Sequence, residues 1–121
     1  MKNLKLIIAF LALFVVSSSF AQDVKTIKFE VDGVCGMCKE RIETALDIKG
    51  VKKATWDVKT HVCEVTYQPS KISENEIHKA INAVGHDTEK MKASYEVYAK
   101  IHACCRYRSE EVKKVHKDEE K

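Results

Sequence analysis

Two cysteines, Cys35 and Cys38, stand three positions apart in the stretch from Gly33 to Cys38. An alternating, strand-like run ends just before this stretch, and a helix-like run begins inside it. Two thiols at a loop-to-helix junction can converge on one soft metal ion, because such ions prefer thiolate sulfur. The same thiols can instead close on each other as a disulfide, so a metal site and a redox pair are both open interpretations.

A second pair of thiols, Cys104 and Cys105, follows His102 near the C-terminal end of the chain. Thiol and imidazole groups are soft or borderline metal ligands. These three residues are therefore candidate ligands of a second metal site, or the thiols fold back to complete the Cys35–Cys38 site. The alternative is a helix on which Cys105 is a small buried hydrophobic residue and Cys104 has no role.

Residues 1–21 have the pattern of a secretory signal peptide. Lys2 and Lys5 precede an apolar run of eleven residues from Leu6 to Val16, and cleavage is expected after Ala21. That run is too short to span a bilayer, which needs roughly 20 residues. We therefore expect a periplasmic or secreted protein with no membrane span after cleavage.

The overall charge is nearly balanced, with 21 Lys and Arg against 18 Asp and Glu, a formal net charge of +3. This balance argues against a nucleic-acid partner, which would require a clustered basic face. The sequence shows no glycine-rich phosphate loop and no nucleophile with a recognisable partner. We therefore predict no catalytic residue, no organic cofactor and no enzyme activity.

Hydrophobic periodicity predicts an α+β fold in residues 22–92. Helices are expected from Cys38 to Leu46 and from a capping box at Ser73 to Val84, and strands at 23–32, 54–58, 63–67 and, with a weak pattern, 86–92. The order β-α-β-β-α-β is that of a ferredoxin-like sandwich, a four-stranded antiparallel sheet with two helices on one face. On the third strand Cys63 shares the phase of Val65, so it is expected in the core.

Residues 93–121 are expected to form a C-terminal extension that is helical and then disordered. Apolar residues at Tyr98, Ile101 and Cys105 favour a helix over the first part. The last five residues, from Lys117 to Lys121, are charged and terminal, so disorder is expected there.

Three stretches, Val31 to Leu46, Gly50-Val51 and Ala83 to His86, resemble the heavy-metal-associated domain. This family includes copper chaperones, N-terminal domains of metal-transporting ATPases and periplasmic mercury-binding proteins. The resemblance implies that Cys35 and Cys38 are the metal ligands.

The resemblance also draws attention to two departures from the family pattern. The family usually has Gly-Met-x-Cys, whereas Gly33-Val34-Cys35 is one residue shorter, and Val34 is expected to take the anchoring role of the methionine. His86 stands where many members have tyrosine, in a loop that lies beside the metal loop in the family fold. It is therefore a candidate third ligand, the alternative being an exposed loop histidine.

The leading interpretation is an exported metallochaperone or scavenger that binds Cu(I), or a similar thiophilic ion, and transfers it by ligand exchange. Hg(II), Zn(II) and Cd(II) also accept thiolates. The expected partner is a metal-transporting ATPase or efflux component, and the protein would be a monomer or a metal-bridged dimer. The alternative is a periplasmic thiol–disulfide redox protein that uses the same CxxC. Against it, a thioredoxin-like fold needs a longer chain and a proline facing the active site, and Pro69 instead precedes the second helix.

Overall fold

A computed structural model describes residues 23–119 of the chain. The expected signal peptide, residues 1–21, lies outside the described residues. Within residues 23–119 no helix combines the length and the apolar character that a membrane crossing needs.

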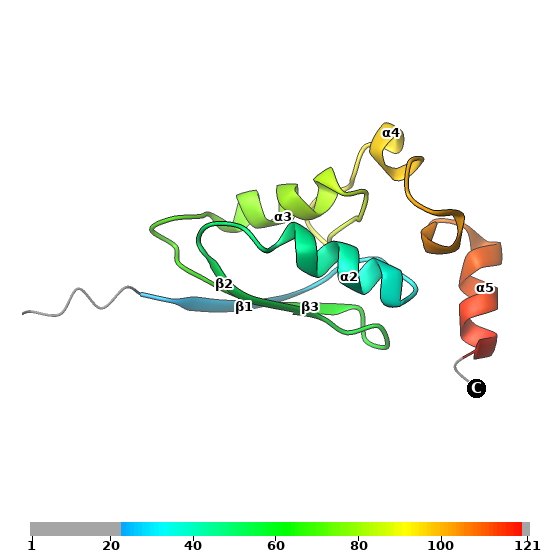
Figure 1. The fold of residues 1–121 in the computed structure, drawn as a ribbon, viewed down its shortest axis with the longest axis horizontal. Coiled ribbons are helices and arrows are strands. Elements are labelled where there is room, and N and C mark those ends of the chain that lie inside the picture. The colour runs from blue at the N-terminus through cyan, green and yellow to red at the C-terminus, as the bar shows by residue number, and fades with distance from the viewer. Residues whose placement is uncertain (1–22, 120–121) are drawn as a thin grey trace, which may run out of the picture.

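Three strands form an antiparallel sheet in the order β1-β3-β2 (Figure 1). Their bounds are Lys25–Glu30 for β1, Val51–Trp56 for β2 and Val62–Tyr67 for β3. On the central strand Cys63 stands opposite Phe29 of β1 and Trp56 of β2, and all three side chains are buried. The three strands that alternation predicted, and the buried position of Cys63, are confirmed, but β2 lies earlier than the expected 54–58 and leaves Val58 in the turn after it.

Two helices, α2 (Gly36–Ala45) and α3 (Glu74–Ala83), lie on one face of the sheet (Figure 1). The capping box that predicted the start of α3 is confirmed, because Ser73 Oγ accepts from the Glu76 amide at 3.2 Å and the Glu76 carboxylate accepts from the Ser73 amide at 3.1 Å. The helices bury the apolar positions expected from their periodicity, among them Cys38, Ile42, Leu46, Ile77 and Ile81. Together with the inward side chains of the strands they form the core.

The fourth strand predicted at residues 86–92 is wrong. Among the described residues this segment contributes one isolated bridge, between Val31 and Thr88. The Thr88 amide donates to the Met91 carbonyl at 2.8 Å, and the Asn82 side chain donates to the same carbonyl at 3.2 Å. A turn closed inside the segment leaves no extended run for a strand ladder.

Residues 93–119, here called the C-terminal extension, form three separate elements instead of the one helix expected. They are α4 (Tyr95–Tyr98), the 3₁₀ helix η2 (Ala103–Cys105) and α5 (Glu110–Glu119), gathered at one end of the molecule (Figure 1). Both Cys105 and Tyr107 are buried, although residues two positions apart point to nearly opposite sides of an α-helix. A continuous helix could not bury both. At its far end α5 continues to Glu119, so Lys117 to Glu119 are helical where we expected disorder to begin.

Candidate metal centre

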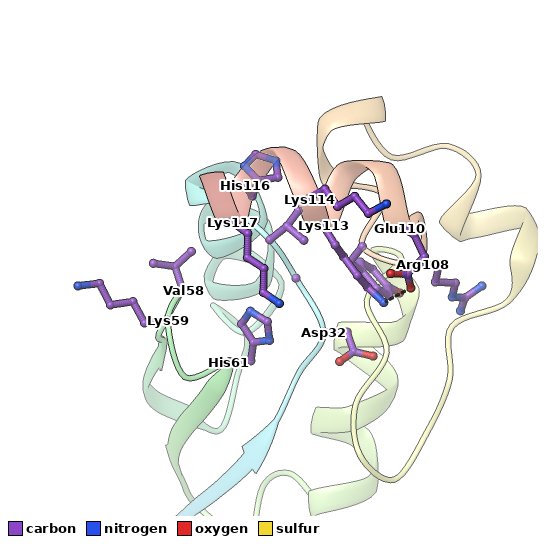
Figure 2. A pocket seen from close by; sticks show the side chains of 13 residues that line it. Asp32, Val58, Lys59, His61, Arg108, Glu110, Lys113, Lys114, His116 and Lys117 are labelled. Atoms are coloured by element: carbon purple, nitrogen blue, oxygen red, sulfur yellow. Dashed lines mark hydrogen bonds and ion pairs between the residues drawn. The ribbon is translucent and has the colours of Figure 1, made fainter. Parts of the chain in front are cut away.

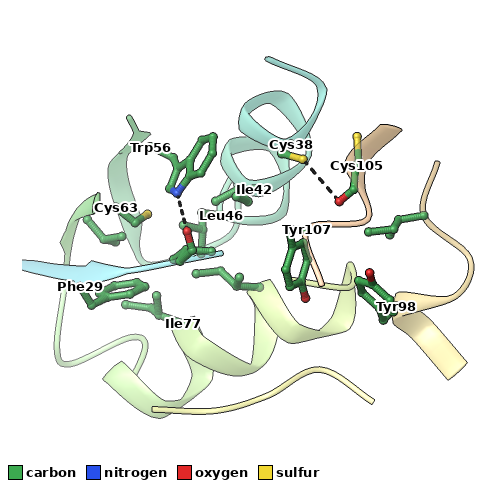
Figure 3. Packing of buried hydrophobic residues seen from close by; sticks show 14 of the residues in the cluster. Phe29, Cys38, Ile42, Leu46, Trp56, Cys63, Ile77, Tyr98, Cys105 and Tyr107 are labelled. Carbon is green, nitrogen blue, oxygen red and sulfur yellow. Dashed lines mark hydrogen bonds between the residues drawn. The ribbon is translucent and has the colours of Figure 1, made fainter. Parts of the chain in front are cut away.

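Three thiols meet where the N-terminus of α2 faces η2. The Sγ atoms of Cys35, Cys38 and Cys105 all lie within 4.8 Å of one another. The Cys35 sulfur is 3.8 Å from that of Cys38 and 3.5 Å from that of Cys105, and Figure 3 shows Cys38 and Cys105 facing each other at the edge of the core. Two sulfurs bound to one ion at ~2.3 Å each lie at most about 4.6 Å apart. These separations therefore suit a single soft ion.

The loop that carries Cys35 is fixed by Trp56. The indole Nε1 donates to the Val31 carbonyl at 3.0 Å, a bond drawn in Figure 3. The ring also approaches Gly33 so closely that an added Cβ would lie 2.8 Å from it. Val34 is partly buried and packs against the core, which is the anchoring position expected for it. Cys35 follows as the N-cap residue of α2, in extended conformation and without a side-chain capping bond.

Burial and hydrogen bonding give the three thiols different pKa values. Burial raises the pKa of Cys35, but hydrogen bonds from the Cys38 amide and the Cys105 thiol outweigh it and hold the pKa below its ordinary value. Burial dominates at Cys38 and Cys105 and raises the pKa of each thiol, although the Arg41 guanidinium opposes the rise at Cys105. Of the three thiols, Cys35 is therefore the one most readily ionised.

The C-terminal extension is fastened to the domain directly after Cys105. The Tyr107 hydroxyl accepts from the Asp87 amide at 2.9 Å and donates to the Gly85 carbonyl at 2.7 Å. Arg108 donates through Nε and Nη2 to the two Asp87 carboxylate oxygens at 3.0 and 2.7 Å. We call Asp87, Tyr107 and Arg108 the Asp87 latch. Because two of its members follow Cys105 by two and three residues, the latch fixes where the third thiol lies.

The extension also passes very close to the main chain at Gly85. This residue has φ +96°, a conformation that L side chains rarely adopt, and an added Cβ would lie 2.7 Å from Ile101 Cγ2. Gly85 directly follows the C-cap residue of α3, and its missing side chain makes room for the extension.

His86 does not join the thiols, and it is not the exposed loop residue posed as the alternative. The ring is fully buried, with Nδ1 donating to the Asp32 carbonyl at 2.7 Å and Nε2 lying 3.3 Å from Arg41 Nη1. It stacks on Tyr107 with ring centroids 5.3 Å apart. Burial lowers the pKa of His86 to about 4, so the ring is neutral near pH 7. Both ring nitrogens are engaged, and the residue helps to support the extension.

Cys104 and His102 lie beside the three-thiol group and outside it. The Cys104 thiol is exposed, with Sγ 3.8 Å from the Cys105 sulfur and 3.7 Å from Met37 Sδ. His102 is also exposed, and its carbonyl accepts from the Cys105 amide at 2.9 Å, so its main chain shapes η2. Sequence reasoning missed Met37, although its place between the two cysteines of CxxC was a usable signal.

An open cavity of about 510 Å³ lies between α5 and the turn that joins β2 to β3 (Figure 2). Its lining includes Lys59, Lys113, Lys114 and Lys117, together with Glu110, and contains no cysteine. The lining also includes Gly33 and Val34 of the loop that carries Cys35, so the cavity borders that loop without including a thiol. Exposed lysines of this kind are ordinarily solvated.

Comparison with known proteins identifies the domain. The sequence profile of the heavy-metal-associated domain matches residues 28–87. The structure of the CopZ metallochaperone is 32% identical, with a TM-score of 0.51, and the match covers 53% of this chain and 98% of that one. Oxidized MerP from Ralstonia metallidurans CH34 is 25% identical, with a TM-score of 0.53, over 55% of this chain and 96% of that one.

A curated relative, a zinc-transporting ATPase from Synechocystis sp., is 39% identical over 72 residues, which cover 58% of this chain and 10% of the ATPase. The chain thus spans only a small part of that relative. The profile includes Cys35 and Cys38 and ends before Cys104 and Cys105. The matches support the ferredoxin-like fold that the order of the expected elements predicted, and the chain belongs to the heavy-metal-associated domain family.

Proposed function

We propose that this protein is an exported, non-enzymatic metallochaperone or scavenger that holds one soft metal ion between Cys35, Cys38 and Cys105. The observation that carries the proposal is the approach of the three Sγ atoms to within 4.8 Å of one another. Cys35 and Cys38 come from the matched domain, and Cys105 comes from the extension. Three sulfur donors and no hard oxygen ligand favour a thiophilic ion.

Cu(I) is the ion that we favour, and Hg(II), Zn(II) and Cd(II) are the competitors. Cu(I) is supported by similar structures, which include the CopZ metallochaperone and a copper binding domain from a P-type ATPase at 29% identity. The zinc-transporting ATPase keeps Zn(II) in consideration. Because all of them accept thiolates, the choice must be made by measurement.

Transfer to a partner would proceed by ligand exchange, with one thiolate replaced at a time. A metal-transporting ATPase or another efflux component is the partner that we favour, since domains of this family occur in P-type ATPases among the relatives. Export rests on the signal-like residues 1–21. Low coordination number and a partly exposed Cys35 would keep such exchange fast.

The test is a competitive Cu(I) titration of the reduced chain beginning at Gln22 against a chromophoric chelator. Wild type is expected to bind one ion per chain, and Cys35→Ser/Cys38→Ser should lose that binding. Cys105→Ser should weaken the affinity by more than about tenfold, which corresponds to about 1.4 kcal/mol. Cys104→Ser is the matched control, because it removes the adjacent thiol and leaves the three-sulfur group intact.

Parallel titrations with Hg(II), Zn(II) and Cd(II) would rank the ions. If Cys104→Ser weakened binding as much as Cys105→Ser, the assignment of the third ligand would be wrong. If the wild type bound none of these ions tightly, the metal proposal would fail. A reduction-potential measurement on the Cys35–Cys38 pair would then test the redox alternative.

A further inference from the structure

Five sulfur atoms form a continuous string from the surface to the core. The string runs from Met37 Sδ through the Sγ atoms of Cys104, Cys105, Cys35 and Cys38, with successive separations of 3.7, 3.8, 3.5 and 3.8 Å. Each step is shorter than the ~4.6 Å over which two sulfurs can share one ion. An ion can therefore bridge every neighbouring pair without losing all sulfur contact between steps.

Exposure changes along the string. Met37 is 44% exposed and Cys104 is also exposed, whereas Cys38 and Cys105 have no exposed surface. Cys35 lies between these extremes. What distinguishes the exposed Met37 thioether is its neighbour, the exposed Cys104 thiol, whose sulfur lies 3.7 Å from it. The outer pair is thus the part of the string that a donor or acceptor can reach most easily.

We propose that Cys104 and Met37 form an entry and exit site for a monovalent soft ion of the Cu(I) class, which passes between this outer pair and the three-thiol site. The inference rests on the proposed function, since it needs a metal-binding three-thiol site. It adds a second binding site and assigns it two residues that the three-thiol group does not include.

The transfer is a sequence of ligand exchanges in which the ion keeps its oxidation state. An ion held by the Cys104 thiolate and the Met37 thioether gains a bond to Cys105 Sγ and loses the bond to Met37. It then gains a bond to Cys35 Sγ and loses the bond to Cys104, which takes up a proton from water. A bond to Cys38 Sγ completes the three-thiol site. Each inner thiol that becomes a ligand releases its proton to water. Release of the ion to an acceptor follows the same exchanges in reverse order.

The donor types indicate a monovalent ion. One thiolate and one neutral thioether give a neutral complex with Cu(I), whereas a divalent ion would keep a net positive charge with the same ligands. Thioether sulfur is also a ligand that selects Cu(I) over harder ions. Ag(I), a soft monovalent ion that keeps its oxidation state, is a practical probe.

The first experiment compares exchange kinetics with equilibrium affinity. Cu(I) transfer between the reduced chain and a chelator is followed by stopped flow, in both directions, for wild type, Cys104→Ser and Met37→Leu. We expect both transfer rates to fall by about tenfold in Cys104→Ser, and by less in Met37→Leu. The equilibrium affinity for Cu(I) should stay within about threefold of wild type in both variants, because the three-thiol site is unchanged.

Two variants serve as controls. Cys104→Met keeps a sulfur at the outer site and should restore most of the lost rate. Met91→Leu makes the same methionine replacement at a partly buried position outside the string and should leave the rate at the wild-type value.

A second experiment detects the outer site directly by nuclear magnetic resonance of the methionine methyl groups. With a second equivalent of Ag(I), the Met37 methyl signal should move while that of Met91 stays in place, and Cys104→Ser should abolish the movement. Unchanged transfer rates in Cys104→Ser, with a Met37 signal that never moves, would overturn the entry site. Failure of the proposed function would look different, because the wild type itself would then show no tight binding at equilibrium.

Discussion

The domain and the C-terminal extension bring their thiols to the same place by different means. The domain holds Cys35 and Cys38 on a loop and helix that rest on a continuous apolar core, and Trp56 braces that loop. The extension is docked by the polar contacts of the Asp87 latch and by four side chains that it adds to the edge of the core, Tyr98, Ile101, Cys105 and Tyr107. Local structure therefore delivers two ligands, and tertiary docking delivers the third.

This difference couples metal affinity to the docking of the extension. A ligand on a preformed loop and helix is already in position, whereas a ligand on a docked segment contributes only while the segment stays docked. Weakening the latch should thus lower affinity through Cys105 alone. Weakening the domain far from the site should lower stability and leave affinity unchanged. Three predictions test this contrast, and they follow in order of expected effect.

The largest effect is expected from Asp87→Ala. Asp87 accepts two hydrogen bonds from Arg108 and a third from the Ala93 amide at 2.7 Å, and its side chain is only 8% exposed. Removing it leaves a charged partner and a buried amide unsatisfied, which should lower the free energy of unfolding by about 3 kcal/mol. Cu(I) affinity should fall toward that of Cys105→Ser. Urea denaturation and competitive titration measure the two effects.

Arg106→Ala is the matched control for this prediction, since Arg106 lies on the same extension and is exposed. It should change stability by less than about 0.5 kcal/mol. A clear loss of stability in Asp87→Ala with wild-type affinity would show that Cys105 does not depend on the latch.

The second prediction concerns pH and the buried His86, which stacks on Tyr107 of the latch. Its pKa is lowered from 6.5 to about 4, chiefly by burial and further by Arg41, with the Asp32 carbonyl and Asp87 opposing. Between these values the unfolded chain binds more protons than the folded one, so stability falls as the pH falls. From pH 7 to pH 5 the loss should be about 2 kcal/mol, and below about pH 4 this group adds no further loss.

Urea denaturation of the metal-free chain across this pH range measures that loss. His86→Gln lacks the titrating ring, so its stability should depend on pH more weakly by the same amount, while all other titrating groups are shared with wild type. Equal pH slopes in the two proteins would mean that His86 is not held neutral by the fold.

The smallest effect is expected from Ser73→Ala, which removes the capping box of α3 at a position remote from the thiols. Loss of the Ser73 side-chain bond to the Glu76 amide should cost about 1 kcal/mol of stability. Cu(I) affinity and transfer rates should stay at wild-type values. A change in affinity here would contradict the division between a rigid domain and a docked third ligand.

Much of the domain could be predicted from the sequence because its signals are local. The alternation around Phe29, the phase of Cys63 and the Ser73–Glu76 pair all act within a few residues, and each gave the correct structure. The prediction of a fourth strand was wrong because the interaction that shapes this segment is not local. The Asn82 side chain donates to the Met91 carbonyl and helps to close a turn there. Hydrophobic periodicity cannot predict a side-chain hydrogen bond of this kind.

The sequence indicated the local half of the candidate site directly, and it gave the other half only as one of several alternatives, that the Cys104–Cys105 thiols fold back to complete the site. Cys35 and Cys38 are marked by their spacing. Cys105 lies 70 positions after Cys35, and the residues around Cys105 in the sequence do not indicate that its thiol meets the other two. Tyr107 and Arg108 look like ordinary residues of a charged tail until Asp87 is placed beside them. For His86 the sequence suggested a role that the structure does not bear out. We considered it a candidate ligand because it lies in a loop near the metal loop, but its ring is buried and bonded to the Asp32 carbonyl, where it supports the extension.

Gly85 has a consequence for protein engineering. A segment such as residues 93–119 can be grafted onto another domain of this family only if the recipient has glycine at the corresponding position, because any side chain there would collide with the residue that takes the place of Ile101. That single backbone position decides whether a two-thiol scaffold can be converted into a three-thiol one by adding a tail. Designers of soft-metal sensors could therefore screen candidate scaffolds at this position first.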